Sequence, residues 1–214
     1  MKQVIFARIS DMKFYKGITE DDKPLSNMAY VKETGDAHEA FNFDAVEMDG
    51  KEICLGFVML IGNSAKTGLQ IRLESMIGGK ALKKENSADG VTVVWCAKDP
   101  YANNIRVVGF YKNATVYRYT QEASFLNEND EVNYIQSFNF IAKKEDCVLL
   151  PYDERNNNKW HVPTSSKGGF DFGFGRSNIW YANSKGENDK EDEYVERMLE
   201  NIENYSGKNW MEEE

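Results

Sequence analysis

The sequence predicts an α+β domain with a mostly antiparallel, barrel-like sheet at its centre and an amphipathic helix at its C-terminal end. Apolar and polar residues alternate with a period of two through much of the first two-thirds of the chain. A β-branched apolar run at 91–97 suits a central strand that is buried on both faces. Apolar residues then recur at helical spacing, at Val195, Met198, Leu199 and Ile202.

Length and composition favour one domain. The chain has 214 residues, of which 41% are hydrophobic and 13% aromatic, so it can bury a core of ordinary size but is short for two independent units. The same values exclude a disordered chain. We therefore expect a single domain over 1–214, with a core at 1–183 and an acidic helix and tail at 184–214.

The clearest local pattern is a hairpin. Apolar residues alternate at 41–45 and again at 53–59, and Asp49-Gly50 between them suits a turn that needs positive φ. Further strands are predicted at 4–9, 28–31 and 133–142.

The middle of the chain predicts a three-stranded meander. The run at 91–97 ends shortly before Pro100, which blocks continuation of the strand. Two more apolar runs, 105–111 and 114–119, flank Lys112-Asn113, which we interpret as a short link because Asn tolerates the left-handed conformation.

The last third of the chain changes character. Residues 151–183 are rich in glycine and aromatic residues, which predicts an ordered loop region. In the helix that follows, Asn188 and Glu191 have the spacing of a capping pair and Gly207 suits a stop. Residues 69–77 fit a strand or a helix equally well.

Several features favour the cytoplasm. Charge arrives early at the N-terminus, and the longest apolar run, 53–61, is far shorter than the roughly 18 residues that span a bilayer, so we expect no membrane association. Cys54, Cys96 and Cys147 are odd in number and lie among apolar neighbours. This usage suits buried thiols in a reducing compartment.

Charge is distributed unevenly along the chain. The net charge is -9, yet residues 63–120 carry nine Lys/Arg and only four Asp/Glu, whereas residues 185–214 carry four and eleven. The acidity therefore lies largely in the tail. A basic binding surface on the central part remains compatible with the overall charge.

Motifs for cofactors are incomplete. Residues 62–67 resemble a phosphate-binding loop but lack the glycine before the lysine, and 173–178 places Asn178 where a dinucleotide fingerprint needs its third glycine. His38 and His161 have no ligand-like spacing to a cysteine, so no zinc site is expected. We predict no cofactor.

Catalytic residues are equally hard to find. Of the three cysteines, Cys147 is the best candidate for a thiol nucleophile, but we prefer to interpret it as a core-packing residue. The carboxylates of Asp11 and of Asp21-Asp22 have the residue types of a metal-dependent hydrolase, but their polar surroundings favour a solvated loop. The sequence thus predicts no catalytic residue and no metal ligand, and it favours a protein that is not an enzyme.

A basic and aromatic constellation is more informative. Aromatic rings can stack on a nucleobase, amides can read its edge, and Arg or Lys can hold a phosphate. The stacking candidates are Trp95, Tyr111, Trp160 and Trp180, and the phosphate or edge candidates are Lys112, Arg118 and Arg176. Asn113, Tyr117, Ser177 and Asn178 complete the predicted site. The alternative is that the rings fill the core.

These segments carry a resemblance. Residues 107–118, followed by Leu149-Leu150-Pro151 and then 173–181, look like segments of bacterial proteins associated with restriction or other nucleic-acid defence. More loosely, a small barrel with an aromatic pocket is similar to the PUA, EVE and YTH group of modified-base readers. This resemblance implies a PUA-like fold and a pocket for a flipped, modified base.

The leading hypothesis is a non-catalytic module that binds DNA or RNA, with a modified base read in an aromatic pocket as its narrower form. Two alternatives stay open: a metal-dependent, nuclease-like hydrolase, whose carboxylates meet only in the fold, and a protein-interaction or immunity module, which engages a basic partner through the acidic C-terminal helix.

Overall fold

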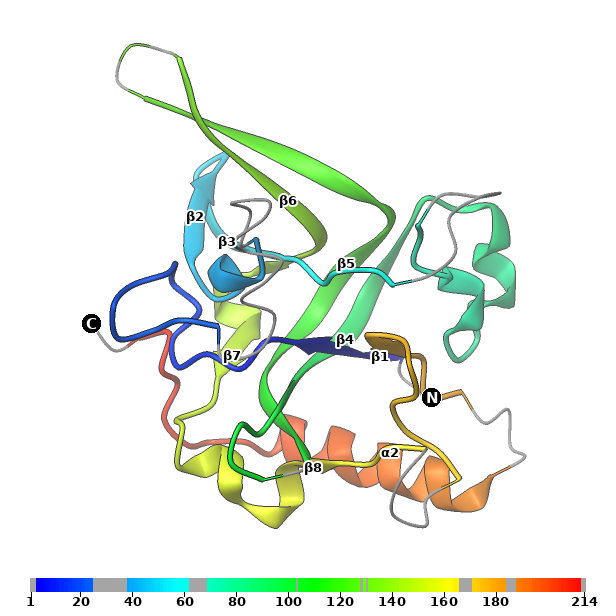
Figure 1. Cartoon of the computed structure of the whole chain (residues 1–214). Coiled ribbons are helices and arrows are strands. Elements are labelled where there is room, and N and C mark those ends of the chain that lie inside the picture. The colour runs from blue at the N-terminus through cyan, green and yellow to red at the C-terminus, as the bar shows by residue number, and fades with distance from the viewer. Residues whose placement is uncertain are drawn as a thin grey trace.

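The protein is an α+β structure built on one large mixed sheet (Figure 1). The computed structural model describes residues 3–24, 38–61, 69–102, 104–127, 129, 131–165, 171–183 and 188–212. The strand expected at 28–31 and the phosphate-loop-like segment at 62–67 lie outside these described residues.

The described part of the sheet has nine strands. They are β1 Val4–Ile9, β2 Ala45–Met48, β3 Lys51–Gly56, β4 Ser87–Lys98, β5 Ile105–Leu126, β6 Val132–Lys143, β7 Cys147–Leu149, β8 His161–Val162 and β9 Ile179–Trp180. The order is β2-β3-β6-β5-β4-β1-β9, with β7 and β8 also paired to β5. β1 runs parallel to β4, and the other paired strands are antiparallel.

The sheet is not closed into a barrel, which corrects the predicted barrel-like shape. β2 and β9 lie at opposite ends of the strand order and do not pair with each other. Alternation along a strand reports which of its faces are buried, but closure depends on pairing between distant strands. The mostly antiparallel character is confirmed.

Both faces of the central strands are buried, as the sequence predicted for 91–97. Val93 and Trp95 of β4 face one hydrophobic core, which we call the first core, together with Tyr111 of β5. Val94 and Cys96 face the opposite core, which also holds residues of the C-terminal helix and which we call the helix-side core. A strand between two cores needs apolar residues at every position.

Helix α2, Asp189–Glu203, covers the helix-side core. Val195, Met198 and Ile202 are its buried apolar stripe, which confirms the predicted helix. The Asn188 side chain caps it by accepting the backbone N–H of Glu191 at 3.2 Å. The helix ends before Asn204, three residues earlier than the predicted stop at Gly207. Among the described residues, no helix has the length and apolar character to cross a membrane.

The predicted hairpin is present with different bounds. Asp49 and Gly50 both adopt positive φ, 51° and 70°, and join β2 to β3. The alternating residues before β2 belong instead to the 3-10 helix η1, His38–Phe41, and to a turn. The side chain of Phe43 lies in the first core, and that of Phe41 packs against it.

The predicted link at Lys112-Asn113 is wrong, because β5 runs without interruption from Ile105 to Leu126. Tyr111 pairs with Val93 and Ala114 with Val91, so two residues of β5 oppose one of β4. Asn113 does adopt positive φ, 52°, but it uses this conformation in a β-bulge. The long β4 offers partners on both sides of the bulge, so the chain needs no turn.

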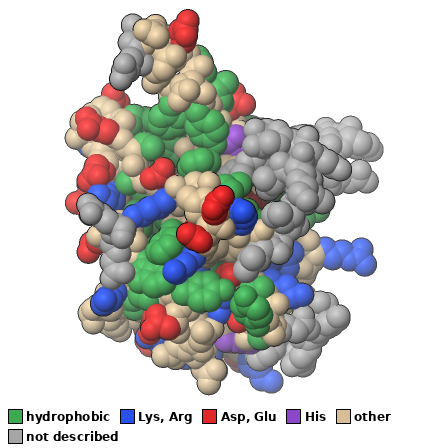
Figure 2. Space-filling model, turned by 60° about the vertical axis from the view of Figure 1, so that its left-hand side comes forward, with side chains coloured by type: hydrophobic (Ala, Val, Ile, Leu, Met, Phe, Trp, Pro, Cys, Tyr) green, Lys and Arg blue, Asp and Glu red, His purple; other side chains and the backbone are tan. Residues whose placement is uncertain are grey.

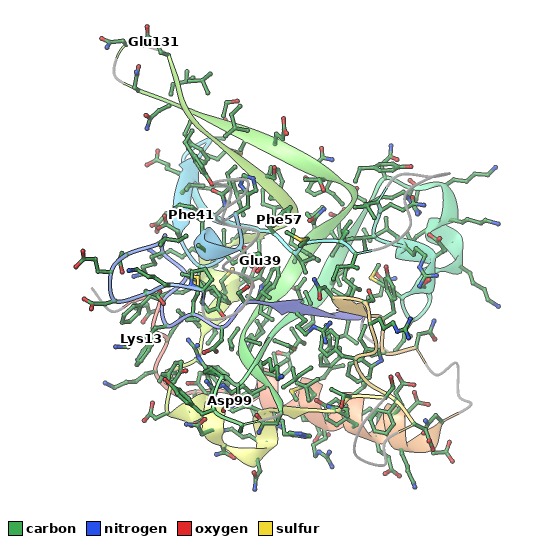
Figure 3. The ribbon with its side chains drawn as sticks, in the orientation of Figure 1. Lys13, Glu39, Phe41, Phe57, Asp99 and Glu131 are labelled. Atoms are coloured by element: carbon green, nitrogen blue, oxygen red, sulfur yellow. The ribbon has the colours of Figure 1, made fainter. Side chains whose placement is uncertain are left out.

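A second irregularity bends β5 at residues 117–120. Val116 pairs with Phe140 and Gln121 with Phe138, so four residues of β5 oppose Asn139 alone. Beyond the bend, β5 and β6 continue as a two-stranded arm that projects from the molecule (Figure 1), with Glu131 near its tip (Figure 3). The remaining elements are the 3-10 helices η2 Leu73–Ser75, η3 Gly79–Lys84, η4 Lys144–Asp146, η5 Glu154–Asn156 and η6 Asn158–Trp160.

Gly109 tests the close packing of the first core. A Cβ at this position would lie 2.5 Å from Phe43 Cζ and 2.5 Å from the Val148 carbonyl oxygen. We expect Gly109→Ala to lower the free energy of unfolding by roughly 1–3 kcal/mol, measured by guanidinium denaturation. Gly175→Ala is the control, because its nearest contact would be an ordinary 3.5 Å. Equal stability of the two variants would contradict this close packing around Gly109.

Candidate nucleic-acid interface

Two of the four predicted stacking rings lie deep in the first core. Trp95 and Tyr111 are each 0% exposed. Their rings meet edge to face at 5.3 Å, and Trp95 makes a similar contact with Phe140 at 5.0 Å. The Tyr111 hydroxyl donates a hydrogen bond to the carbonyl of Asn42. This placement favours a packing role over base stacking for both rings.

The other two rings lie in the helix-side core. Trp160 is 0% exposed and donates its indole N–H to Glu154 Oε1 at 2.8 Å. Trp180 is 9% exposed, and its ring stacks on Phe6 with 4.4 Å between centroids. Of the four rings, Trp180 alone lines a surface pocket among the described residues.

The predicted cation Arg118 is buried and makes only internal contacts. It lies in the bend of β5, and its guanidinium donates to the carbonyls of Leu82 and Glu85, each at 2.8 Å. It also forms an ion pair of 2.8 Å with Glu74 of η2. Arg118 therefore ties the ends of η2 and η3 to the sheet instead of offering charge to a ligand, because it is 6% exposed.

Three other predicted residues are not brought to a common site. Lys112 lies 3.7 Å from Glu203 of α2, and Asn113 donates its side-chain amide to Asp146 at 3.1 Å. Tyr117 packs edge to face on Phe138, 5.8 Å away, beside the arm. These contacts place the three side chains on different parts of the surface.

The segment before β9 does gather predicted residues. Arg176 and Ser177 are exposed, whereas Asn178 is buried and cross-links two segments. Its side-chain amide donates to the Met59 carbonyl at 2.9 Å, and its side-chain oxygen accepts from Arg8 at 3.1 Å. Asn178 thereby fixes the approach to Trp180, two residues further along.

Beside this segment lies a group of cations that the residue-level predictions missed. The group consists of four exposed residues, which we call the basic corner: Arg72, immediately before η2, and Lys80, Lys83 and Lys84 of η3. Arg72 lies over the ring of Tyr181 at 5.4 Å. None of its three lysines forms an ion pair with another described residue. The signal available in the sequence was the basic balance of 63–120.

A pocket of about 370 Å³ lies between η2 and the segment that carries β9, and we call it the η2–β9 pocket. The residues that matter for its chemistry are Glu74, Ser75, Trp180, Tyr181, Asn183 and Glu191. Two hydrogen bonds hold its walls together: Asn183 donates its amide to the Ser75 carbonyl at 2.9 Å, and Tyr181 Oη accepts the Arg72 N–H at 2.8 Å. In Figure 1, η2 and η3 lie above the orange segment that carries β9.

Glu191 is a buried acid in the wall of this pocket. It lies in the first turn of α2, is 7% exposed, and accepts the indole N–H of Trp180 on Oε1 at 3.0 Å. Burial raises the pKa of the Glu191 carboxyl, the Trp180 hydrogen bond opposes this shift, and the negative charge of Asp192 adds to it. Sequence reasoning recognised Glu191 only as a capping residue.

A half-buried aromatic group surrounds η1. His38 meets Phe57 edge to face at 5.3 Å, and Phe41 lies 5.4 Å from Tyr134 of the arm. Below them, the Glu39 carboxylate accepts the backbone N–H groups of Ser10 and Met59 (Figure 3 labels Glu39, Phe41 and Phe57). Glu39 thus fastens η1 to the chain that follows β3. Both of its oxygens are occupied by the protein itself.

An apolar surface lies at the base of the arm. Ile53, Leu55 and Phe138 form a small cluster with partly buried neighbours that include Tyr117. Figure 2 shows hydrophobic side chains gathered on the face below the arm. Leu126, Val132 and Ile135 of the arm are 56%, 58% and 45% exposed. This surface is distinct in character from the basic corner.

Asp11 and Asp22 are buried, which corrects the interpretation of a solvated loop, whereas Asp21 is exposed as that interpretation expected. Asp11 is 1% exposed, accepts the Tyr152 hydroxyl at 2.9 Å and lies 3.6 Å from Arg106. Asp22 is 4% exposed and accepts the backbone N–H groups of residues 13–15. Backbone donors and a buried guanidinium replace water around these carboxylates.

Within the described residues, no three His, Cys, Asp or Glu side chains come close enough to hold a metal ion. The three cysteines are free and buried, so the interpretation of Cys147 as a packing residue agrees with its position. Comparison with known protein families, with characterised proteins and with solved structures finds no match for this chain.

Arg118 provides a test of how the basic corner is held. We expect Arg118→Lys to lower the free energy of unfolding by about 2–3 kcal/mol, because an ammonium cannot serve Glu74 and two carbonyls in one plane. Hydrogen exchange at the amides of 79–85 should rise as well. Arg176→Lys is the matched control at an exposed site. Unchanged hydrogen-exchange protection of η3 in Arg118→Lys would contradict the role of Arg118 in holding η3 to the sheet.

Glu191 provides a test of burial through pH. Its pKa in the folded state is raised above the usual 4.5, so the folded protein holds this proton more tightly than the unfolded chain. Its contribution to stability is therefore full below about pH 4.5 and is lost as the pH rises through the folded pKa. We expect Glu191→Gln, which has no such proton, to show a flatter decline of unfolding free energy over this window in urea titrations. Parallel curves would contradict the shift.

Proposed function

We propose that the chain is a non-catalytic nucleic-acid-binding module that holds the phosphate backbone of DNA or RNA on the basic corner. The observation that carries this proposal is the basic corner itself, four exposed cations (Arg72 with Lys80, Lys83 and Lys84), of which Arg72 lies over the ring of Tyr181 in the wall of the η2–β9 pocket. Phosphate contacts by Lys and Arg supply most sequence-independent affinity for nucleic acids.

The electrostatics of the basic corner differ from those of the whole chain. Residues 72–84 contain these four cations and a single carboxylate, Glu74, which is ion-paired with Arg118 at 2.8 Å. The net charge of -9 is concentrated elsewhere, largely in 185–214. Because exposed charges are screened within about 10 Å at moderate salt, a phosphate at the corner interacts mainly with the local cations.

The η2–β9 pocket supports the narrower proposal that the module accommodates a base, including a modified one. Its volume of about 370 Å³ is within the range of small-molecule sites. Tyr181 supplies an aromatic wall and Trp180 one edge, while Arg176 and Ser177 are exposed nearby. A similarity to PUA, EVE and YTH readers is part of this proposal and would require such a pocket.

The alternatives receive less support. A metal-dependent hydrolase needs grouped carboxylates, and the described part of the chain shows no such cluster. An interaction module that works through α2 has exposed Glu193, Glu196 and Glu200 on that helix. That face is also the ordinary solvated side of an amphipathic helix, so it does not favour a partner.

A charge-removal variant tests the basic corner. We expect the triple variant Lys80→Gln, Lys83→Gln and Lys84→Gln to weaken binding to fluorescent oligonucleotides, both single-stranded and duplex, in anisotropy titrations over a salt series. The slope of log affinity against log salt should fall by roughly two, because up to three phosphate contacts are lost.

The matched control replaces three exposed lysines on other elements, Lys23, Lys98 and Lys190, by Gln. It removes the same total charge. The proposal fails if the two triple variants have the same affinity and salt slope, or if the unmodified protein binds no oligonucleotide.

A further inference from the structure

The η2–β9 pocket has carboxylates on two of its walls. Glu74 reaches it from η2 and Glu191 from α2, so the two acids come from elements far apart in sequence. The negative charge of these acids would repel a phosphate from the pocket, whereas the basic corner would attract it. A nucleotide that binds here would therefore place its phosphate on the corner and its base inside.

Glu191 retains capacity to accept further hydrogen bonds. A carboxylate has two oxygens and about four lone-pair sites. Among the described residues, Trp180 is the donor to its side chain, through a single N–H at 3.0 Å to Oε1. The same contact fixes the orientation of the carboxylate, because the Trp180 ring is itself stacked on Phe6. Glu191 is thus a positioned acceptor in the wall of the pocket.

Glu74 is the second carboxylate of the pocket, but its environment differs from that of Glu191. Its Oε2 is bound to Arg118 at 2.8 Å, and its side chain is 31% exposed. The ion pair compensates most of its charge, so the less compensated carboxylate in the pocket is Glu191. Tyr181 adds an aromatic side chain to the wall, and the Arg72 guanidinium lies over its ring at 5.4 Å.

We infer that the η2–β9 pocket takes a nucleobase that presents an exocyclic amino group, and that Glu191 is the residue that accepts its N–H. This inference rests on the proposed function. Cytosine, adenine and guanine carry an exocyclic amino group that donates N–H to a carboxylate, whereas thymine and uracil carry carbonyl oxygens at their exocyclic positions and keep only the ring N3–H as a donor. A base made cationic by N-methylation adds its positive charge to this contact and is attracted by the Glu191 carboxylate.

The test uses single-stranded oligonucleotides that are identical except at one central position, which is cytosine, thymine or the cationic base 3-methylcytosine. For the wild-type protein we expect cytosine to bind roughly tenfold more tightly than thymine, and 3-methylcytosine at least as tightly as cytosine. In Glu191→Gln the preference for cytosine over thymine should fall to within about twofold, because the amide presents both a donor and an acceptor.

The salt slope separates base reading from phosphate binding. It should be unchanged in Glu191→Gln, since no cation of the basic corner is altered. Glu193→Gln is the matched control, because Glu193 is exposed on the same helix. It should keep the wild-type preference for cytosine.

The outcomes distinguish the inference from the proposed function. Salt-dependent binding with equal affinity for cytosine and thymine would overturn the inference and leave the function standing. Failure to bind any oligonucleotide would overturn both. Loss of affinity for all bases alike in Glu191→Gln, with a lower melting temperature, would assign Glu191 to the support of Trp180 and overturn the inference. If that variant does not fold, the wild-type comparison of the three bases still decides.

Discussion

The burial of both faces of the central strands is the constraint on which the rest of the structure depends. Every residue from Val91 to Ala97 has an exposed fraction of 0%. Because exposed apolar area costs free energy on either face, the chain must supply a cover on each side of the sheet. Helix α2 covers one face, and short segments, including η1 and η2, cover the other.

This constraint also explains where the η2–β9 pocket lies. Leu73 and Met76 at η2 belong to the cover of the first core, whereas Trp180 and Val195 belong to the helix-side core. The two covers approach each other at the end of the strand order that carries β9. Side chains from both layers can line a common pocket only at such an edge, since elsewhere the sheet separates them.

Local structure could be predicted well where a local pattern determines it. The turn at Asp49-Gly50, the doubly buried strand and the helix after Asn188 each follow from the chemistry of a few neighbouring residues. The interpretation of Asn113 was wrong because positive φ serves a turn and a bulge equally well. The choice between them depends on the length of β4, a partner that the local sequence does not contain.

The candidate site was less predictable for a related reason. Residue type indicates what a ring or a guanidinium can do, but tertiary position decides whether it does so. Trp95 and Trp180 have the same chemistry, yet Trp180 lines the η2–β9 pocket and Trp95 is fully buried, because β9 lies at an edge and β4 lies at the centre. Glu191 could be read from the sequence only as a cap, since its contact with Trp180 spans two elements.

Basic residues also differ in whether their position leaves them exposed, and this determines which substitutions can test the surface. Of the basic residues in 63–120, Arg106 and Arg118 are 3% and 6% exposed and are engaged by internal partners, so the net charge of the segment overstates what a ligand meets. Removal of the acidic C-terminal segment would change packing as well as charge. Val195 and Ile202 are each 0% exposed, and their loss would open the helix-side core. Only substitutions of exposed side chains separate charge from packing in this protein, because each of its covering layers also holds the sheet together.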